Sequence, residues 1–462
     1  MNREAWKLEA PEQLRRPQGR IPWLAAALAC SLTFLILCLA AADVLSPDGE
    51  KTAAAQREIT FTQLIPGRLG TPCRVTVTAQ NESYTLILSE GVCSLQGEGA
   101  AVDQHAAKEL LSSGAAVIAR QRLEGDPEDF GLGAQALQAE FTYEDGTHLT
   151  LRLGNPVPTG EGWYAQMEGD NAIWVVNNSL QQTLNTKKQA LYALPDLSER
   201  FTAQTLLSVT VAQPGAETVA VARVTKTNPF NTKVELTEPI HYPANAERAA
   251  EVYLALEQLQ ITGVKDLHGQ DADWGLDEPL AVLLLEDKVS TRLTIGEKDG
   301  AYTLRIDGED AVYTLDPQSL SFLGDVSVPW LAEQLPGLVM LSQVEEITVR
   351  TQDETVVFHT DQANAAYAVN GRAMAEEEFL PLYQQMIGML IERYVPEDAE
   401  AGELRLQMEY TLNTGEVWTL SLTDFDESYD LIVRGGCARF LISKAKTDAL
   451  IETIINTQEV AP

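Results

Sequence analysis

Four residues near the C-terminus, Ser443-Lys-Ala-Lys446, have the Ser-x-x-Lys spacing that carries the nucleophilic serine of penicillin-binding enzymes. The Ser-Asp-Asn and Lys-Thr-Gly motifs that accompany it in those enzymes are absent from this sequence. A serine directly before a helix-like stretch is also a common N-cap. We therefore interpret Ser443 as a helix N-cap and assign no nucleophile.

Oxygen-bearing side chains alternate at Asp424, Asp426, Ser428 and Asp430, a spacing that could offer ligands to Ca²⁺. The position after Ser428 is Tyr429, where the loop of an EF-hand needs glycine for its sharp turn. A second acidic cluster, formed by Asp271, Asp273 and Asp277, surrounds Trp274 and could in principle pair carboxylates for acid/base chemistry. We expect both clusters to be solvated loops.

The remaining motifs for metal, nucleotide or nucleophile chemistry are missing. The histidines are scattered without a His-x-x-x-His or His-Glu-x-x-His pair, and no Cys-x-x-Cys, Walker A or Gly-x-Ser-x-Gly sequence occurs. The sequence thus predicts no catalytic residue, no cofactor and no metal site, and the chain is not expected to be an enzyme. The formal net charge is −34, so the chain lacks the excess of Lys and Arg side chains that nucleic-acid binding requires.

Aromatic residues recur in the strand-like segments and allow two interpretations. They are Trp163, Tyr164, Trp174, Tyr302, Tyr313 and Trp418. Such residues could line a platform that binds sugar rings, or they could be cross-strand pairs of a core. The second interpretation is the more ordinary one for strand positions, and the first makes a polymer- or peptidoglycan-binding module the alternative function.

Residues 21–42 form an apolar run long enough for a helix to cross the hydrocarbon core of a membrane. The run exceeds the hydrophobic region of a cleaved signal peptide, although Ala40 and Ala42 resemble a cleavage site. Basic residues precede it and acidic residues follow it, which places residues 1–20 in the cytoplasm as a basic tail. We expect a single-pass membrane protein whose C-terminal bulk is extracytoplasmic, with residues 43–58 as a polar tether.

Five cysteines are few for an extracytoplasmic protein of this length, and two of them lie in the predicted membrane segment. Cys73 and Cys93 could meet across neighbouring strands and form a disulfide, or they could be a pair of buried thiols. Cys437 is left without a partner in either case. The sequence does not decide between the two states.

Two stretches of the chain repeat one pattern: an aromatic-Gly-Leu opening, a hairpin, a strand that ends in glycine, and an aromatic strand. The first copy contains Phe130, Gly131, Leu132, Asp145, Gly146 and Gly154, and the second contains Trp274, Gly275, Leu276, Pro279, Gly296 and Tyr313. A third, degenerate copy at residues 404–442 keeps only the hairpins. We interpret these residues as packing and turn positions rather than reactive ones.

Helix-like segments follow or precede the copies, at residues 102–119, 179–194, 244–259 and 375–394. The predicted fold class is therefore α+β, an N-terminal transmembrane helix followed by tandem antiparallel-sheet-plus-helix repeats. The predicted repeats span residues 59–200, 201–341 and 342–462.

The motif residues of both copies resemble those of a bacterial membrane-anchored family catalogued as domain of unknown function 4340. The resemblance implies an extracytoplasmic accessory protein of ABC-type or gliding-motility-like transport systems. From it we expect a non-enzymatic accessory or scaffold component of a transport or cell-envelope complex, whose partner is an ABC permease or envelope protein.

Overall fold

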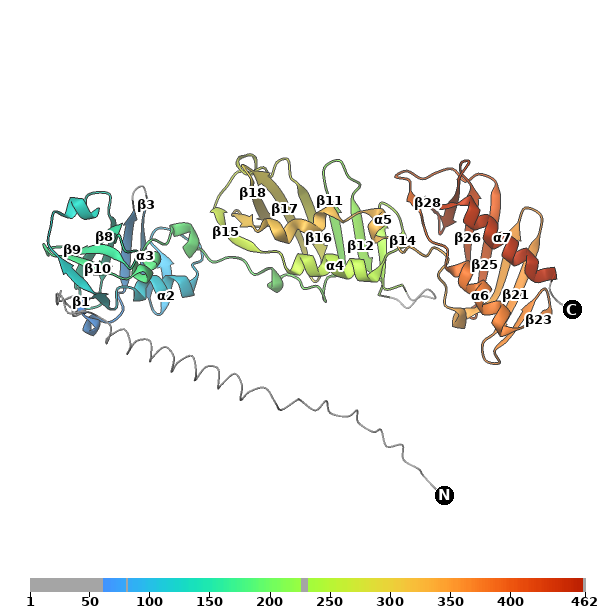
Figure 1. The fold of residues 1–462 in the computed structure, drawn as a ribbon, viewed down its shortest axis with the longest axis horizontal. Coiled ribbons are helices and arrows are strands. Elements are labelled where there is room, and N and C mark those ends of the chain that lie inside the picture. Colours follow the sequence, from blue (N-terminus) through green and yellow to red (C-terminus); the bar gives the residue numbers. More distant parts are fainter. Residues whose placement is uncertain (1–60, 80–81, 226–231, 460–462) are drawn as a thin grey trace, which may run out of the picture. The chain divides into compact units, whose positions relative to one another are not determined.

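The computed structural model of the protein describes residues 61–79, 82–225 and 232–459 (Figure 1). These residues form three large antiparallel sheets and one small sheet of two strands, β1 (Thr62–Ile65) and β5 (Val117–Ala119). No helix among them is long and apolar enough to cross a membrane. The predicted cytoplasmic tail, membrane span and tether lie outside the described residues.

The first sheet has eight strands in the order β4-β3-β2-β7-β8-β9-β10-β6. Its strands are β2 (Arg74–Ala79), β3 (Glu82–Ser89), β4 (Val92–Leu95), β6 (Gln121–Leu123), β7 (Leu137–Thr142), β8 (His148–Pro156), β9 (Trp163–Met167) and β10 (Ile173–Val176). Its α-helices are α2 (Gln104–Ser112) and α3 (Asn178–Leu184). Short 3-10 helices are η1 (Gly67–Leu69), η2 (Pro127–Phe130), η3 (Lys188–Leu191) and η4 (Leu197–Glu199).

The second sheet has nine strands in the order β14-β13-β12-β11-β16-β17-β18-β19-β15. They are β11 (Ser208–Ala212), β12 (Val219–Arg223), β13 (Val234–Glu238), β14 (Tyr242–Pro243), β15 (Ile261–Asp266), β16 (Ala281–Glu286), β17 (Ser290–Lys298), β18 (Ala301–Ile306) and β19 (Val312–Leu315). Its helices are α4 (Ala246–Glu257), α5 (Val328–Leu331), η5 (Asp271–Asp273) and η6 (Pro317–Gly324).

The third sheet also has nine strands, in the order β23-β22-β21-β20-β25-β26-β27-β28-β24. They are β20 (Val344–Thr351), β21 (Thr355–Asp361), β22 (Ala366–Val369), β23 (Arg372–Met374), β24 (Arg393–Tyr394), β25 (Leu404–Leu412), β26 (Val417–Asp424), β27 (Tyr429–Arg434) and β28 (Cys437–Ser443). Its helices are η7 (Leu341–Gln343), α6 (Glu376–Ile387) and α7 (Lys444–Glu459).

The three large sheets share one topology. In each, a meander begins at a central strand (β2, β11 or β20), and a second meander of four strands begins on the other side of that strand. A short strand after the first helix (β6, β15 or β24) then pairs with the far edge of the second meander. Each sheet lies within one predicted repeat, and the exact boundaries of the repeats stay a prediction.

The predicted fold class is wrong in its helix content. The described residues are mainly antiparallel β-structure with few helices, and the predicted membrane helix is not among them. Two of the four predicted helical segments form much shorter helices than predicted, whereas α4 and α6 occupy most of residues 244–259 and 375–394. In residues 102–119, α2 ends at Ser112 and the last three residues are strand β5; in residues 179–194, α3 ends at Leu184. Gly114 and the pairing of β5 with β1 follow the end of α2, and Asn185 caps the end of α3.

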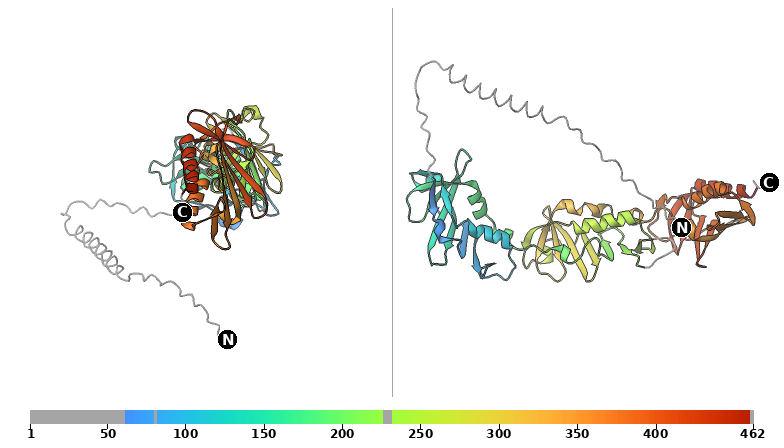
Figure 2. Two further views of the ribbon diagram at one scale, coloured as in Figure 1. Left: turned by 90° about the vertical axis from the view of Figure 1, so that its right-hand side faces the viewer. Right: turned by 90° about the horizontal axis from the view of Figure 1, so that it is seen from below.

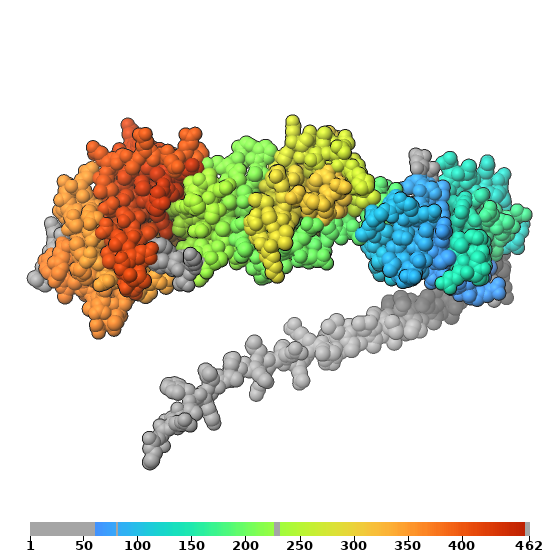
Figure 3. Space-filling model, turned by 180° about the vertical axis from the view of Figure 1, so that it is seen from behind, coloured from blue at the N-terminus to red at the C-terminus, as the bar shows by residue number. Residues whose placement is uncertain are grey.

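The core of each sheet lies between its strands and the helices that cross one face (Figures 1 and 2). Strand β16 illustrates the pattern, since Ala281, Leu283 and Leu285 are buried while Leu284 is exposed on the other face. In the third sheet, α7 packs on the same face as α6. The side chains of this part of the chain, coloured orange to red in Figure 3, form one continuous packed body.

Candidate functional site

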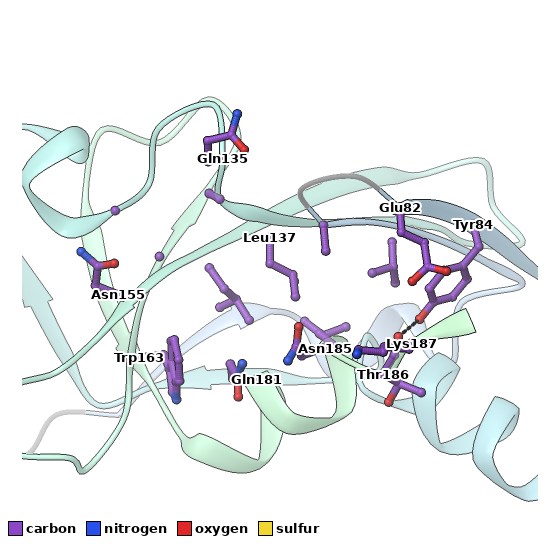
Figure 4. Close-up of a pocket in the computed structure, with 17 residues that line it drawn as sticks. Glu82, Tyr84, Gln135, Leu137, Asn155, Trp163, Gln181, Asn185, Thr186 and Lys187 are labelled. Carbon is purple, nitrogen blue, oxygen red and sulfur yellow. Dashed lines mark hydrogen bonds between the residues drawn. The ribbon is translucent and has the colours of Figure 1, made fainter. Parts of the chain in front are cut away.

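A groove of about 620 Å³ lies between the first sheet and the segment that runs from α3 to η3 (Figure 4). Its volume is in the range of ordinary small-molecule sites. The sheet contributes residues from β2, β3, β7, β8 and β9, and the opposite wall comes from α3 and the residues after it. We call this cavity the groove.

The floor of the groove is apolar. Val77, Leu153 and Leu184 are buried, and Leu137 is partly buried beside them. The sheet register explains the arrangement, because Leu137 pairs with Leu153 directly across β7 and β8, so that both side chains lie on the same face. Leu184, at the end of α3, closes the floor from the helix side.

One hydrogen bond fixes the wall of the groove at its far end. The hydroxyl of Tyr84, on β3, donates to the backbone carbonyl of Thr186 at 2.5 Å (Figure 4). Burial raises the pKa of the Tyr84 phenol above its ordinary value. Tyr84 is therefore a neutral hydrogen-bond donor that ties the segment after α3 to the sheet.

The helix that forms the wall begins at a well-defined cap. Asn177 precedes α3, and its side-chain oxygen accepts a hydrogen bond from the backbone amide of Leu180 at 2.9 Å. This cap sets where α3 starts. It thereby places Gln181 and Asn185 one turn apart on the groove side.

Four carboxamide side chains line the groove: Gln135 just before β7, Asn155 on β8, and Gln181 and Asn185 from the α3 segment (Figure 4). None of the four side-chain amides has a hydrogen-bond partner among the residues that the structure describes. Trp163, on β9, is half-buried and lies at the same end of the groove as Asn155 and Gln181. The groove therefore combines free amide donors and acceptors with one aromatic ring.

The charged residues of the groove are one acid and one base, Glu82 and Lys187. The lining contains no serine, cysteine or histidine among the residues that the structure describes. A set of carboxamides, one indole and an apolar floor is suited to hold an uncharged ligand rich in hydroxyl or amide groups.

The motif residues of the first copy shape the rim beside the groove. Gly131 ends η2 with φ of +73°, and its neighbour Phe130 packs edge-on against the ring of Tyr164, with 4.8 Å between the ring centroids. A Cβ on Gly154 would stand 2.2 Å from the carbonyl oxygen of Phe130. Leu132 is buried. These residues serve packing, and Gly131 and Gly154 also line the groove.

The second copy packs in the same way. Gly275 has φ of +70°, and a Cβ on Gly296 would stand 2.5 Å from its carbonyl oxygen. Trp274 accepts a hydrogen bond at its backbone carbonyl from Thr303, at 2.8 Å. The other motif residues of this copy also have structural roles. Leu276 is buried and Pro279 lies just before β16. The hydroxyl of Tyr313 donates to Glu309 at 2.5 Å.

The predicted Asp-Gly turn of the first copy lies in the connection between β7 and β8, far along the strands from the groove. Gly146 has φ of +83°, and Asp145 accepts a hydrogen bond from the backbone amide of Thr147 at 2.9 Å. That hydrogen bond lowers the pKa of Asp145. Both residues are turn-formers here.

The acidic clusters and the Ser-x-x-Lys sequence take part in hydrogen bonds and ion pairs. The prediction of a solvated loop is wrong for Asp430, which is buried on β27. Asp426 accepts from the backbone amides of Ser428 and Tyr429, and Asp271 pairs with Arg305 at 2.9 Å. Ser443 ends β28 directly before α7, and its hydroxyl donates to Glu392, which also pairs with Lys446. Across the described residues, no group of three or more His, Cys, Asp or Glu side chains is arranged to hold a metal ion.

Cys73 and Cys93 are free thiols in the structure, as is Cys437. The Cys73 thiol donates to the carbonyl of Thr142 at 3.3 Å, and Cys93 is buried. Of the two states that the sequence allows, the structure has the unbridged one.

The sequence did not predict the groove, although one signal pointed toward it. Trp163 was among the aromatic residues that could form a sugar platform, and it is the one of that set that lines the groove. Trp174, by contrast, donates from its indole nitrogen to Asp170 at 3.1 Å. Gln181 and Asn185 carried no signal, because amides in a short helix are typical of a solvated surface.

Comparison with known protein families gives a match over part of the chain. Residues 96–266 match the family model described as Domain of unknown function (DUF4340). The matched residues include α2, the second meander of the first sheet, the α3 wall of the groove and the beginning of the second sheet. No curated protein and no solved structure matches the chain.

Proposed function

We propose that this chain, whose residues 96–266 belong to the family described as domain of unknown function DUF4340, is a non-enzymatic accessory protein of the cell envelope. In this proposal the chain is a component of an ABC-type transport or envelope complex. Its predicted helix at residues 21–42 anchors it, and its sheets are extracytoplasmic. Its role is to bind a partner or ligand rather than to transform one.

The observation that carries this proposal is the lining of the groove. A cavity of ordinary ligand-site volume is surrounded by carboxamides, an indole and aliphatic side chains, with one carboxylate and one amine. Such groups hold a ligand through hydrogen bonds and apolar contact. The part of the lining around Trp163 is made of uncharged amides and aliphatic side chains, and Glu82 and Lys187 lie at the other end of the groove.

Capture of partners from native membranes tests the accessory role. The tagged full-length protein is crosslinked in its membrane, purified and analysed by mass spectrometry. We expect an ABC permease, its ATPase or an envelope protein to be recovered with the chain. Recovery of the tagged protein alone, with an efficient crosslinker, would count against the accessory role.

A second candidate function is supported by Trp163 in particular. Trp163 is half-buried beside these amide side chains. Sugar-binding sites commonly combine an aromatic ring, which the apolar face of the sugar covers, with amides that bond to its hydroxyl groups. The chain would then be a module that binds an extracellular polymer or peptidoglycan. Binding of the purified chain to isolated cell walls, compared with binding of Trp163→Ala, tests this candidate.

A further inference from the structure

We propose that the groove of the first sheet binds a short segment of a neutral oligosaccharide, with Trp163 under a sugar ring and the carboxamides of Asn155, Gln181 and Asn185 on its hydroxyl or acetamido groups. This inference rests on the second candidate function and assigns its site and ligand class.

The repeated topology allows the first sheet to be compared with the second, position by position. Gly154 follows Leu153 on β8, and Gly296 follows Ile295 on β17. Both glycines lie against the backbone of the aromatic-Gly-Leu segment of their own sheet. Leu153 then pairs with Ala165, and Ile295 pairs with Leu304. Strand β8 has one more residue than β17 after this pair, so Pro156 lies opposite Trp163 where Glu297 lies opposite Tyr302. On this register Trp163 corresponds to Tyr302.

The register extends to the segment that covers the sheet. Ala165 pairs with Trp174 on β10, and Leu304 pairs with Tyr313 on β19. Three residues later each chain reaches a cap, Asn177 before α3 and Asp316 before η6. After the caps the two segments differ, because α3 is an α-helix and η6 is a 3-10 helix. The leucines that face the sheet are Leu180 and Leu184 in α3, and Leu320 and Leu323 in η6.

Gln181 lies beside this packed face. Its neighbour Leu180 packs against the core of the first sheet, as Leu320 does in the second. Gln181 itself is half-buried and lines the groove, and its amide has no hydrogen-bond partner among the described residues. Its donor and acceptor are therefore available to a ligand in the groove.

Asn185 and Asn155 have no exact counterparts in the second sheet. Asn185 follows the α-helix α3, whereas the second sheet has the 3-10 helix η6. Asn155 lies in the irregular part of β8, where this strand has one residue more than β17. Both residues are uncharged amides. The groove is therefore uncharged around Trp163, while Glu82 and Lys187 lie at the other end with Tyr84 (Figure 4).

A saccharide fits these groups better than a peptide strand does. The groove lies between a sheet face and a helix, away from the open strand edge to which an extended peptide adds. Each carboxamide offers both a donor and an acceptor, which matches a hydroxyl group that also does both. An anionic ligand is disfavoured because Lys187 is the one basic group in the described lining and the chain carries a formal charge of −34.

The test uses the full-length chain purified in detergent and isothermal titration with tetra-N-acetylchitotetraose and with cellotetraose. We expect at least one of them to bind. Trp163→Ala and Gln181→Leu should each weaken binding by about tenfold or more, since each removes a central contact. Trp163→Tyr, which introduces the aromatic residue of the second sheet, should retain most of the affinity.

The matched control is Tyr302→Ala, the same truncation at the corresponding position of the second sheet. It should leave binding unchanged, and thermal melts of every variant report whether the sheets remain folded. Gln181→Leu is expected to melt no earlier than the unaltered chain, because the half-buried Gln181 amide makes no hydrogen bond to the described residues that the substitution would remove.

Three results would overturn the inference: no titration with either saccharide at millimolar concentration, equal affinity of Trp163→Ala and the unaltered chain, or binding of a peptidoglycan stem peptide in place of the saccharides. The accessory role is tested separately by crosslinked capture from membranes with Trp163→Ala. Recovery of the same partner by this variant would leave the accessory role standing even if the groove bound no sugar.

Discussion

The backbone of Gly275 lies directly against Gly296, so that a Cβ on Gly296 would stand 2.5 Å from the carbonyl oxygen of Gly275. The first sheet has the same relationship, with a Cβ on Gly154 3.0 Å from the carbonyl oxygen of Gly131 and closer still to that of Phe130. The aromatic-Gly-Leu segment can reach its place on the sheet only if the strand opposite has no side chain at this point.

Substitution of either strand glycine by alanine should therefore destabilise its sheet. We expect Gly154→Ala and Gly296→Ala each to cost about 1–3 kcal/mol, the usual range for a side chain forced into a packed interior. Calorimetric melts of the full-length chain measure the effect. Gly133→Ala is the matched control, because the nearest atom to its Cβ would be 3.9 Å away; an equal loss in the control would contradict the close-approach explanation.

Removal of the Tyr84 hydroxyl should loosen the wall of the groove. Tyr84→Phe leaves the carbonyl of Thr186 without its donor, which should lower the free energy of unfolding by about 1 kcal/mol. Because the same bond holds the segment that follows Gln181 and Asn185, the variant should also bind its ligand more weakly. Tyr164→Phe is the control, since the Tyr164 hydroxyl has no hydrogen-bond partner among the described residues. Equal stability of both variants would show that the bond to Thr186 does not hold the wall.

The local features of the sheets could be predicted from sequence because they depend on neighbouring residues. Alternating apolar residues around Asp145-Gly146 predict a hairpin, and the structure has one with Gly146 at positive φ. The resemblance to the domain-of-unknown-function family is confirmed over residues 96–266. The accessory role that this resemblance implies stays a prediction.

The helix content and the groove could not be predicted in the same way. Residues 102–119 have an amphipathic pattern, but Val117–Ala119 pairs with β1, a partner more than fifty residues away. Trp163 and Gln181 line the same groove because of the sheet register and the cap at Asn177, and the sequence around either residue does not reveal this. Both the end of α2 and the formation of the groove depend on strand pairing between residues far apart in the sequence. A local sequence pattern carries no information about such pairing.

The cysteines should behave as thiols of low reactivity. Burial raises the pKa of Cys93 and of Cys437, which lowers the fraction of reactive thiolate at neutral pH. We expect iodoacetamide to label both slowly in the native chain and rapidly after denaturation without reductant, with modified peptides identified by mass spectrometry. If denatured, unreduced protein yields no modified Cys73 or Cys93, the two residues are bridged and the unbridged state is incorrect.

Asp430 gives the third sheet a pH dependence of definite sign. The residue is completely buried on β27, Arg405 Nε lies 3.5 Å from its carboxylate, and neither carboxylate oxygen accepts a hydrogen bond from the described residues. Burial, the largest cause, raises its pKa above the ordinary 3.8. The folded chain then binds the Asp430 proton more tightly than the unfolded chain does. The contribution of this proton to the free energy of unfolding is fully present below the pKa of Asp430 in the unfolded chain, and it is lost as pH rises through the pKa in the folded chain.

Asp430→Asn should remove this loss, because the amide is similar in size to the carboxyl group and does not ionise. We expect the variant to gain stability relative to the unaltered chain as pH rises from about 4 to 7, with the two most alike at the acidic end. Thermal melts across this range measure the difference. Asp448→Asn is the matched control, since Asp448 is the exposed partner of the same Arg405. The opposite result would be a stability gain of Asp430→Asn over the unaltered chain that shrinks as pH rises. It would mean that the ion pair with Arg405 outweighs the cost of burying the charge, and that the folded chain holds the Asp430 proton less tightly than the unfolded chain does.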